Sequence, residues 1–142
     1  MALPVVLVLA FSVAAQEKDK SKDKDARPKL TVKVTPSMGG TAPARIVASA
    51  DLFGGAPDGE ELYCPAVEWD FGDDTKSTTS ADCDPYEAGK SEIKRRFTAE
   101  HSYPNGGSFR IQLRLKKKNK VIVSGSTSVQ IRPGIHEGGQ SY

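Results

Sequence analysis

The strongest constraint on the fold is a strict alternation of apolar and polar residues between positions 109 and 115. The apolar members are Phe109, Ile111, Leu113 and Leu115. This period of two is typical of a β-strand with one buried face. Positions 67 to 71 repeat the pattern with Val67, Trp69 and Phe71. Two such strands predict a sheet whose apolar face packs against a second layer.

Five further short segments have the composition of strands and lie between turns rich in Gly and Pro. They cover residues 30–35, 45–50, 75–81, 93–98 and 121–131. No segment has the 3.6-residue period of a long helix. We therefore predict an all-β protein, an Ig-like β-sandwich of two antiparallel sheets with about seven strands.

The first 27 residues differ in composition from the rest and fall into two parts. Residues 1–15 are mostly Val, Leu and Ala, carry no charged side chain and end in small residues. They predict a secretory signal peptide, because the apolar run is shorter than the ~20 residues that span a bilayer. The alternative is an uncleaved anchor on a membrane surface. Residues 16–27 are rich in Lys and Asp and predict a charged, disordered spacer.

The remaining chain is expected to hold one folded domain, residues 28–133, followed by a Gly-rich flexible tail, residues 134–142. A signal peptide would place this domain in a secreted, periplasmic or cell-surface setting, with no membrane span in the mature chain. The net charge of +2 is small for a nucleic-acid-binding protein, so nucleic acid is not an expected partner.

Two cysteines, Cys64 and Cys83, predict a disulfide in an exported chain, and neither has the neighbouring Cys or His of a zinc site. A four-residue hairpin loop over positions 72–75 would pair Phe71 with Lys76 and would bring Cys64 opposite Cys83. A bulge at Pro65 would shift this pairing by one residue.

Two motifs lie on either side of Cys83. The first is Trp69-Asp70-Phe71-Gly72-Asp73, and the second is His101-Ser102-Tyr103 followed by Gly107 and the alternation described above. Together they resemble the PKD (polycystic kidney disease) repeat family over residues 28–133. Asp74 replaces the final Gly of the family's first motif, and the segment 74–100 is longer than usual. The resemblance implies an Ig-like sandwich that serves as a non-catalytic interaction module for an unknown extracellular protein or polysaccharide.

The motif residues have physical roles of their own. Trp69 is the only Trp and is expected at the centre of the core. Gly72 is expected to supply a backbone conformation that the turn requires, and the Asp73 carboxylate to accept hydrogen bonds from backbone N–H groups there. Tyr103 matches a tyrosine corner, whose hydroxyl fixes a crossing loop. His101 is interpreted as a structural histidine.

No motif that carries a catalytic mechanism is present, neither a Gly-x-Ser-x-Gly elbow nor a His-Glu-x-x-His pair nor a Walker loop. We therefore expect no enzyme, no catalytic residue and no cofactor. Calcium is the one metal considered, because acidic side chains gather in loops. The candidates are Asp51, Asp58, Asp73 and Asp74. A solvated acidic loop is the alternative, since the acidic residues have neither the EF-hand spacing nor a repeat spacing.

Two further functional hypotheses rest on surface composition. Planar aromatic side chains are typical of carbohydrate sites, and only Phe53, Tyr63 and Tyr86 are available outside the expected core. The alternative function is therefore an accessory carbohydrate- or calcium-binding module of a secreted hydrolase system. The basic residues of 94–96 and 116–120 are compatible with an anionic partner, but Lys on strand edges also prevents aggregation.

The alternation also predicts an ion pair on the outer face of the sandwich. Strand 109–115 is expected beside strand 67–71, as in Ig-like folds. The outward side chains of one strand are then basic, Arg110 and Arg114, and those of the other are acidic, Glu68 and Asp70. We expect at least one Arg to pair with one acid across the two strands.

Overall fold

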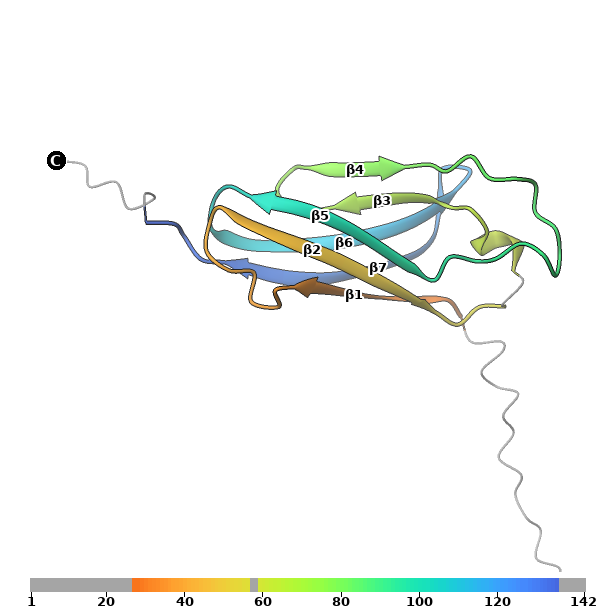
Figure 1. The fold of residues 1–142 in the computed structure, drawn as a ribbon, viewed down its shortest axis with the longest axis horizontal. Coiled ribbons are helices and arrows are strands. Elements are labelled where there is room, and N and C mark those ends of the chain that lie inside the picture. The colour runs from red at the N-terminus through yellow and green to blue at the C-terminus, as the bar shows by residue number, and fades with distance from the viewer. Residues whose placement is uncertain (1–26, 57–58, 136–142) are drawn as a thin grey trace, which may run out of the picture.

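The computed structural model describes residues 27–56 and 59–135. Within them seven strands form two antiparallel sheets (Figure 1). One sheet has the order β1-β2-β5 and the other β4-β3-β6-β7. The strands are β1 (Lys29–Thr35), β2 (Ala44–Phe53), β3 (Ala66–Asp70), β4 (Lys76–Thr79), β5 (Arg96–Tyr103), β6 (Gly107–Lys117) and β7 (Lys120–Ile131). The predicted β-sandwich of two antiparallel sheets is confirmed.

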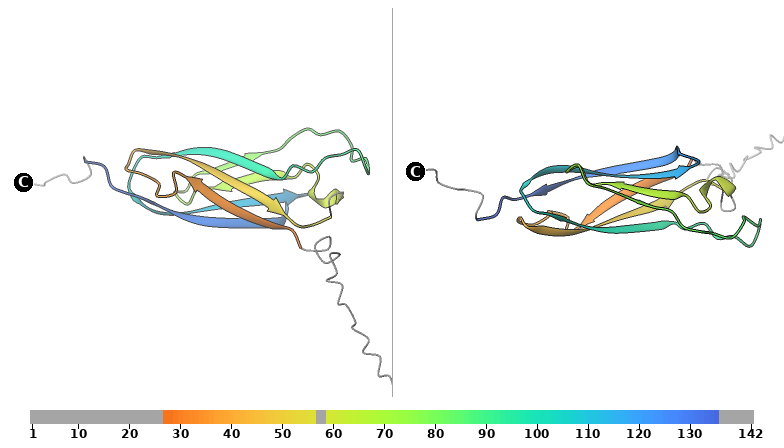
Figure 2. Two further views of the ribbon diagram at one scale, coloured as in Figure 1. Left: turned by 60° about the horizontal axis from the view of Figure 1, so that its bottom comes forward. Right: turned by 90° about the horizontal axis from the view of Figure 1, so that it is seen from above.

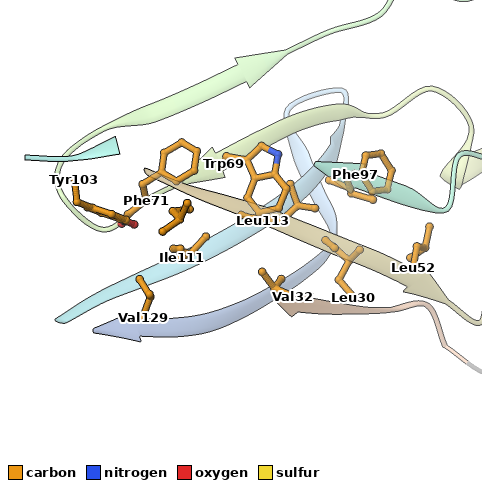
Figure 3. Close-up of a cluster of buried hydrophobic side chains, with 14 of the residues drawn as sticks. Leu30, Val32, Leu52, Trp69, Phe71, Phe97, Tyr103, Ile111, Leu113 and Val129 are labelled. Carbon is orange, nitrogen blue, oxygen red and sulfur yellow. The ribbon is translucent and has the colours of Figure 1, made fainter. Parts of the chain in front are cut away.

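The core lies between the two sheets because each strand turns alternate side chains inward. In β6 the inward residues Ile111, Leu113 and Leu115 are completely buried. In β2 the inward residues include three alanines, Ala44, Ala48 and Ala50, beside the larger Ile46 and Leu52. Trp69 is 3 % exposed and packs within this layer, as predicted. Figure 3 shows Tyr103 and Phe71 at one end of the buried cluster and Phe97 and Leu52 at the other.

The fifth strand begins and ends later than the sequence pattern predicted. The pattern suggested residues 93–98, whereas β5 covers Arg96–Tyr103 because it pairs with β2 along its length, from Asp51↔Arg96 to Ala44↔Tyr103. Ile93 packs against the core from the preceding loop. The His-x-Tyr motif therefore forms the last three residues of β5 and does not lie in a corner before the next strand.

The register of the β3–β4 hairpin differs by one residue from the prediction. Asp70 pairs with Lys76, so the loop contains Phe71 to Thr75 and has five residues. The Phe71 N–H donates to the Thr75 carbonyl at 3.1 Å and closes this loop. Gly72 and Asp74 have positive φ, 78° and 66°, which allows the chain to reverse over this longer loop.

Connections gather at the two ends of the sandwich (Figures 1 and 2). We call one the motif end, which comprises residues 71–75 and 101–103. We call the other the disulfide end, which comprises residues 60–65, with the short 3-10 helix η2 (Glu60–Leu62), and residues 80–95. Figure 2 shows residues 80–95 extending beyond the strands in both views.

No helix among the described residues is both long and apolar enough to cross a membrane. Three predictions lie outside the described residues: the signal peptide, the calcium candidate Asp58 and residues 136–142 of the flexible tail. Of the predicted spacer, only Arg27 is described.

Candidate functional site

At the motif end, both aspartates of the first motif bind the backbone of their own turn. The Gly72 N–H donates to Asp70 Oδ1 at 3.0 Å, and the Thr75 N–H donates to Asp73 Oδ1 at 3.2 Å. The Thr75 hydroxyl donates to the same Asp73 oxygen. Gly72 cannot be replaced freely, because a Cβ here would lie 2.6 Å from the Arg110 carbonyl oxygen. The predicted capping contact of Asp73 is therefore present, and it stabilises the turn.

The second motif binds to this turn from the other sheet. His101 Nε2 lies 2.7 Å from Asp73 Oδ2, and its ring stacks on Phe71 with centroids 4.1 Å apart. The Tyr103 hydroxyl donates to the Phe71 carbonyl at 2.7 Å. A tyrosine corner bonds to backbone a few residues upstream. The Tyr103 hydroxyl therefore does not make the bond of a tyrosine corner. It bonds the β3–β4 turn instead, because the end of β5 faces that turn, and it joins the two sheets there.

The environment of this cluster affects its titration. Burial opposes ionisation of Asp73, but hydrogen bonds from Thr75 and His101 outweigh it, so the pKa of this carboxyl is lowered. Burial, with smaller contributions from the Asp73 and Asp70 charges, raises the pKa of Tyr103. The Tyr103 ring stacks on Phe109 at 4.3 Å. The carboxylate and the phenol of this cluster are thus held in the states that their hydrogen bonds require.

Gly107, the last residue of the second motif, begins β6 next to this cluster. A Cβ on Gly107 would lie 3.1 Å from the Phe109 ring, and φ there is 155°. The structure thus brings together the residues of both motifs: His101 and Tyr103 link the β3–β4 turn to β5, and the Tyr103–Phe109 ring contact links β5 to β6.

The predicted ion pair is present on the outer face of the four-stranded sheet. Arg114 Nη1 lies 2.9 Å from Glu68 Oε1 and 3.8 Å from Asp70 Oδ2. Lys116 Nζ lies 2.6 Å from the other Glu68 oxygen. Hydrogen bonds from Lys116 and then Arg114 lower the pKa of Glu68, whose side chain is 15 % exposed. Arg110 instead bonds Ser126 on β7.

The acidic residues considered for calcium are not brought together. Asp51 lies on β2 and pairs with Arg96 at 3.7 Å, whereas Asp73 lies at the motif end and bonds Thr75 and His101. Among residues 27–56 and 59–135, no group of three or more His, Cys, Asp or Glu side chains is arranged to hold a metal ion. The described candidates therefore do not form one site.

At the disulfide end, residues 80–95 form the longest connection between consecutive described strands, and several contacts fasten it. Cys64 and Cys83 form the predicted disulfide, with Cα atoms 6.3 Å apart. The Tyr63 hydroxyl donates to the Asp84 carbonyl at 2.8 Å, and its ring lies 5.5 Å from that of Tyr86. Lys117 Nζ donates to the Tyr63 carbonyl at 2.7 Å, so the segment that contains Tyr63 is itself attached to β6.

Two adjoining hollows lie against this loop. One is an open groove of about 720 Å³ with a mixed polar and apolar lining, and the other is a smaller, mainly apolar pocket of about 190 Å³. The groove is lined by Tyr63, Asp84, Pro85, Glu87, Lys90, Ser91 and Glu92. The pocket is lined by Tyr63, Cys64, Pro65, Val67, Thr79, Ala81, Cys83, Glu92, Lys94 and Phe97. Tyr63 and Glu92 contact both hollows and make the surface continuous.

The sequence motifs directed attention to the other end of the molecule. The sequence predicts Tyr63 and Tyr86 as exposed aromatic residues, and it gives no pattern that joins Tyr63 to the other residues that line the groove. The signal that could have found them is the unusual length of the segment 74–100 together with its cysteine, since long ordered loops carry binding sites.

No known protein-family model matches the chain, and no curated protein matches it in sequence. The resemblance to PKD repeats therefore stays a prediction that rests on the two motifs.

Proposed function

We propose that this protein is a secreted or periplasmic, PKD-like interaction module that has no catalytic role and binds a partner through its disulfide end. The observation that carries the proposal is the continuous groove and pocket along residues 80–95. Loops on a rigid β-scaffold are the usual place for recognition in sandwich proteins.

The state of this loop supports binding. The disulfide and the Tyr63 contacts to Asp84 and Tyr86 hold the loop against the sandwich before any partner arrives. A surface that is already ordered loses less conformational entropy on association, so more of the contact energy appears as affinity. The disulfide also fits the export that the first fifteen residues predict.

The motif end supports the same choice by a different route. Asp70, Asp73, His101 and Tyr103 are the residues that a catalytic hypothesis would use. Each of them has at least one polar atom bonded to the β3–β4 turn or to another motif residue. Their contacts explain the motifs as a structural link between the sheets.

A second candidate is carbohydrate binding. The observation that favours it is the Tyr63–Tyr86 ring pair, of which Tyr63 lines the groove together with Glu87, Glu92 and Lys90. Aromatic rings with nearby hydrogen-bonding groups are typical of sugar sites. The two candidates use the same groove and differ in the chemistry of the partner.

The test uses the full-length exported protein, immobilised and challenged with secreted proteins of its own source and with a panel of soluble glycans. Two variants, Glu87→Lys and Glu92→Lys, reverse charges in the groove, and Glu61→Lys is the control, because Glu61 does not line the groove. We expect a protein or polymer that binds the wild type and the control but binds the groove variants at least about tenfold more weakly. A partner that binds all four proteins equally would exclude the groove as the site.

A further inference from the structure

The outer edge of β4 has free backbone groups. β4 is the first strand in its sheet and pairs only with β3. The Phe71–Thr75 bond marks one hydrogen-bonded pair, and such pairs alternate with non-bonded pairs along an antiparallel ladder. Ser77 and Thr79 therefore bond β3, whereas Lys76 and Thr78 direct their N–H and C=O groups to the open edge. This edge has the geometry that accepts another strand.

The sandwich is also uncovered along this edge. Ser77 and Thr79 pair with Trp69 and Val67, whose side chains belong to the core layer, yet both β4 side chains are exposed. The apolar pocket lies here, between Thr79 and Ala81 on one side and Phe97 at the start of β5 on the other. Its volume of about 190 Å³ is below the ~300–1,000 Å³ of ordinary small-molecule sites. It is of a size to take one apolar side chain.

The loop that follows β4 is acidic. Residues 81–93 contain Asp82, Asp84, Glu87 and Glu92 against Lys90, so four negative charges and one positive charge give −3. Lys90 pairs with Glu87 at 3.3 Å. Among the described residues, no ion pair involves the carboxylates of Asp82, Asp84 or Glu92. Lys94 lies at the pocket, with Nζ 5.4 Å from the Phe97 ring centre. Lys94 and Arg95 follow and reduce the net charge of the whole connection, residues 80–95, to −1, so it is residues 81–93 that complement a basic partner.

We propose that β4 accepts an extended, basic segment of a partner protein as a fifth strand of its sheet. One apolar side chain of this segment occupies the pocket beside Phe97, and its Lys or Arg residues lie against residues 81–93. Backbone hydrogen bonds at Lys76 and Thr78 provide affinity that does not depend on the partner's sequence, and the pocket and the acidic loop provide selectivity. This inference rests on the proposed function as an interaction module and specifies the chemistry of the partner.

The test selects peptides from a phage-displayed library of random peptides of about ten residues, the upper length of an ordinary strand. The bait is the full-length oxidised protein. We expect enriched peptides to alternate apolar and polar residues and to carry Lys or Arg near one end. A synthetic peptide of that sequence should bind more weakly as salt increases, because the charged contacts are exposed. On binding, the amides of Lys76 and Thr78 should become protected from hydrogen exchange.

Two variants test the mode of binding. Thr78→Pro removes an outward N–H without removing a bond to β3, and Ala81→Phe fills the pocket from an exposed position. Each should weaken peptide binding by about tenfold, an effect of the size of one strong backbone hydrogen bond or one buried side chain. Thr98→Pro is the matched control. Thr98 is exposed on β5, the edge strand of the other sheet, and its N–H also points away from its neighbour β2. It should change affinity by no more than about twofold.

Several outcomes would overturn the inference. The inference fails if the library yields no specific peptide. It also fails if Thr78→Pro does not change the affinity of the selected peptides. If sedimentation shows a wild-type dimer that Thr78→Pro dissociates, the occupant of the edge is a second copy of this chain and not a basic partner. If a protein or glycan binds the groove but ignores Thr78→Pro and Ala81→Phe, the inference fails and the proposed function stands. If nothing binds the groove or the edge, both fail.

Discussion

Replacing Cys64 and Cys83 together by Ser should lower the free energy of unfolding by about 3 kcal/mol. The bond joins residues 19 positions apart. In the chain-entropy model a loop of that length restricts the unfolded chain by about 3 kcal/mol at 25 °C. Neither cysteine lies in the paired part of β3 or β4, since β4 ends at Thr79. The loss should therefore leave the pairing of the strands intact.

The same replacement should loosen the disulfide end before the rest of the molecule. Without the bond, the Tyr63 hydroxyl contact to Asp84 and the packing of Tyr63 on Tyr86 still attach the segment before β3 to the start of this loop. Amides of residues 80–95 should exchange faster in the variant, while those of β6 keep the protection expected of the central strand. Binding at the groove should weaken for the same reason.

Urea unfolding followed by the fluorescence of Trp69 measures this loss. Trp69 is the only Trp and is 3 % exposed, so its emission reports exposure of the core. The wild type in reducing buffer serves as a matched control, because it should unfold like the double variant, and the variant itself should not respond to reductant. A loss below about 1 kcal/mol would refute the loop-entropy reasoning. Two free thiols in the protein purified under oxidising conditions would refute the disulfide itself.

Three other predictions concern the motif end and the outer ion pair. Tyr103→Phe leaves the buried Phe71 carbonyl without its donor and should cost about 1–3 kcal/mol in urea unfolding; a cost below about 0.5 kcal/mol would contradict this role. A double-mutant cycle on Glu68 and Arg114 should give a coupling near 1 kcal/mol, and zero coupling would show that the half-buried pair is not stabilising. The lowered pKa of Asp73 means that its ionised form stabilises the fold above the ordinary value of 3.8, and that this stabilisation is lost as pH falls through the folded pKa. Asp73→Asn should therefore be less stable at neutral pH and should show a shallower fall in stability below pH 3.8; parallel pH profiles would argue against it.

The sequence predicted residue positions correctly where they follow from the alternation of apolar and polar residues along a strand. Because side chains on neighbouring strands share a face, the pattern alone predicted that an Arg at 110 or 114 would meet an acid at 68 or 70. The structure selects Arg114 with Glu68. The one-residue error in the β3–β4 register arose because loop length depends on which residues adopt positive φ, here Gly72 and Asp74.

The candidate site was largely hidden from the sequence for a different reason. The groove joins Tyr63, from the segment before β3, to residues 84–92 after β4. No periodic pattern links these segments, and only the disulfide and the path of the loop bring them together. The tyrosine corner was predicted from local spacing, whereas the actual partner of Tyr103 is a carbonyl 32 residues away.

The sequence by itself determined the class of the fold, the two faces of its strands and the pairing of its only two cysteines. These follow from local rules: the two-residue period of a strand, the burial of apolar side chains and the chemistry of a lone pair of thiols. Only the tertiary structure decided how His101 and Tyr103 contact the β3–β4 turn and where the groove and the pocket form. Both depend on which loops meet at each end of the sandwich. That meeting is set by the packing of two sheets against one core, a balance of contacts between residues far apart in the chain.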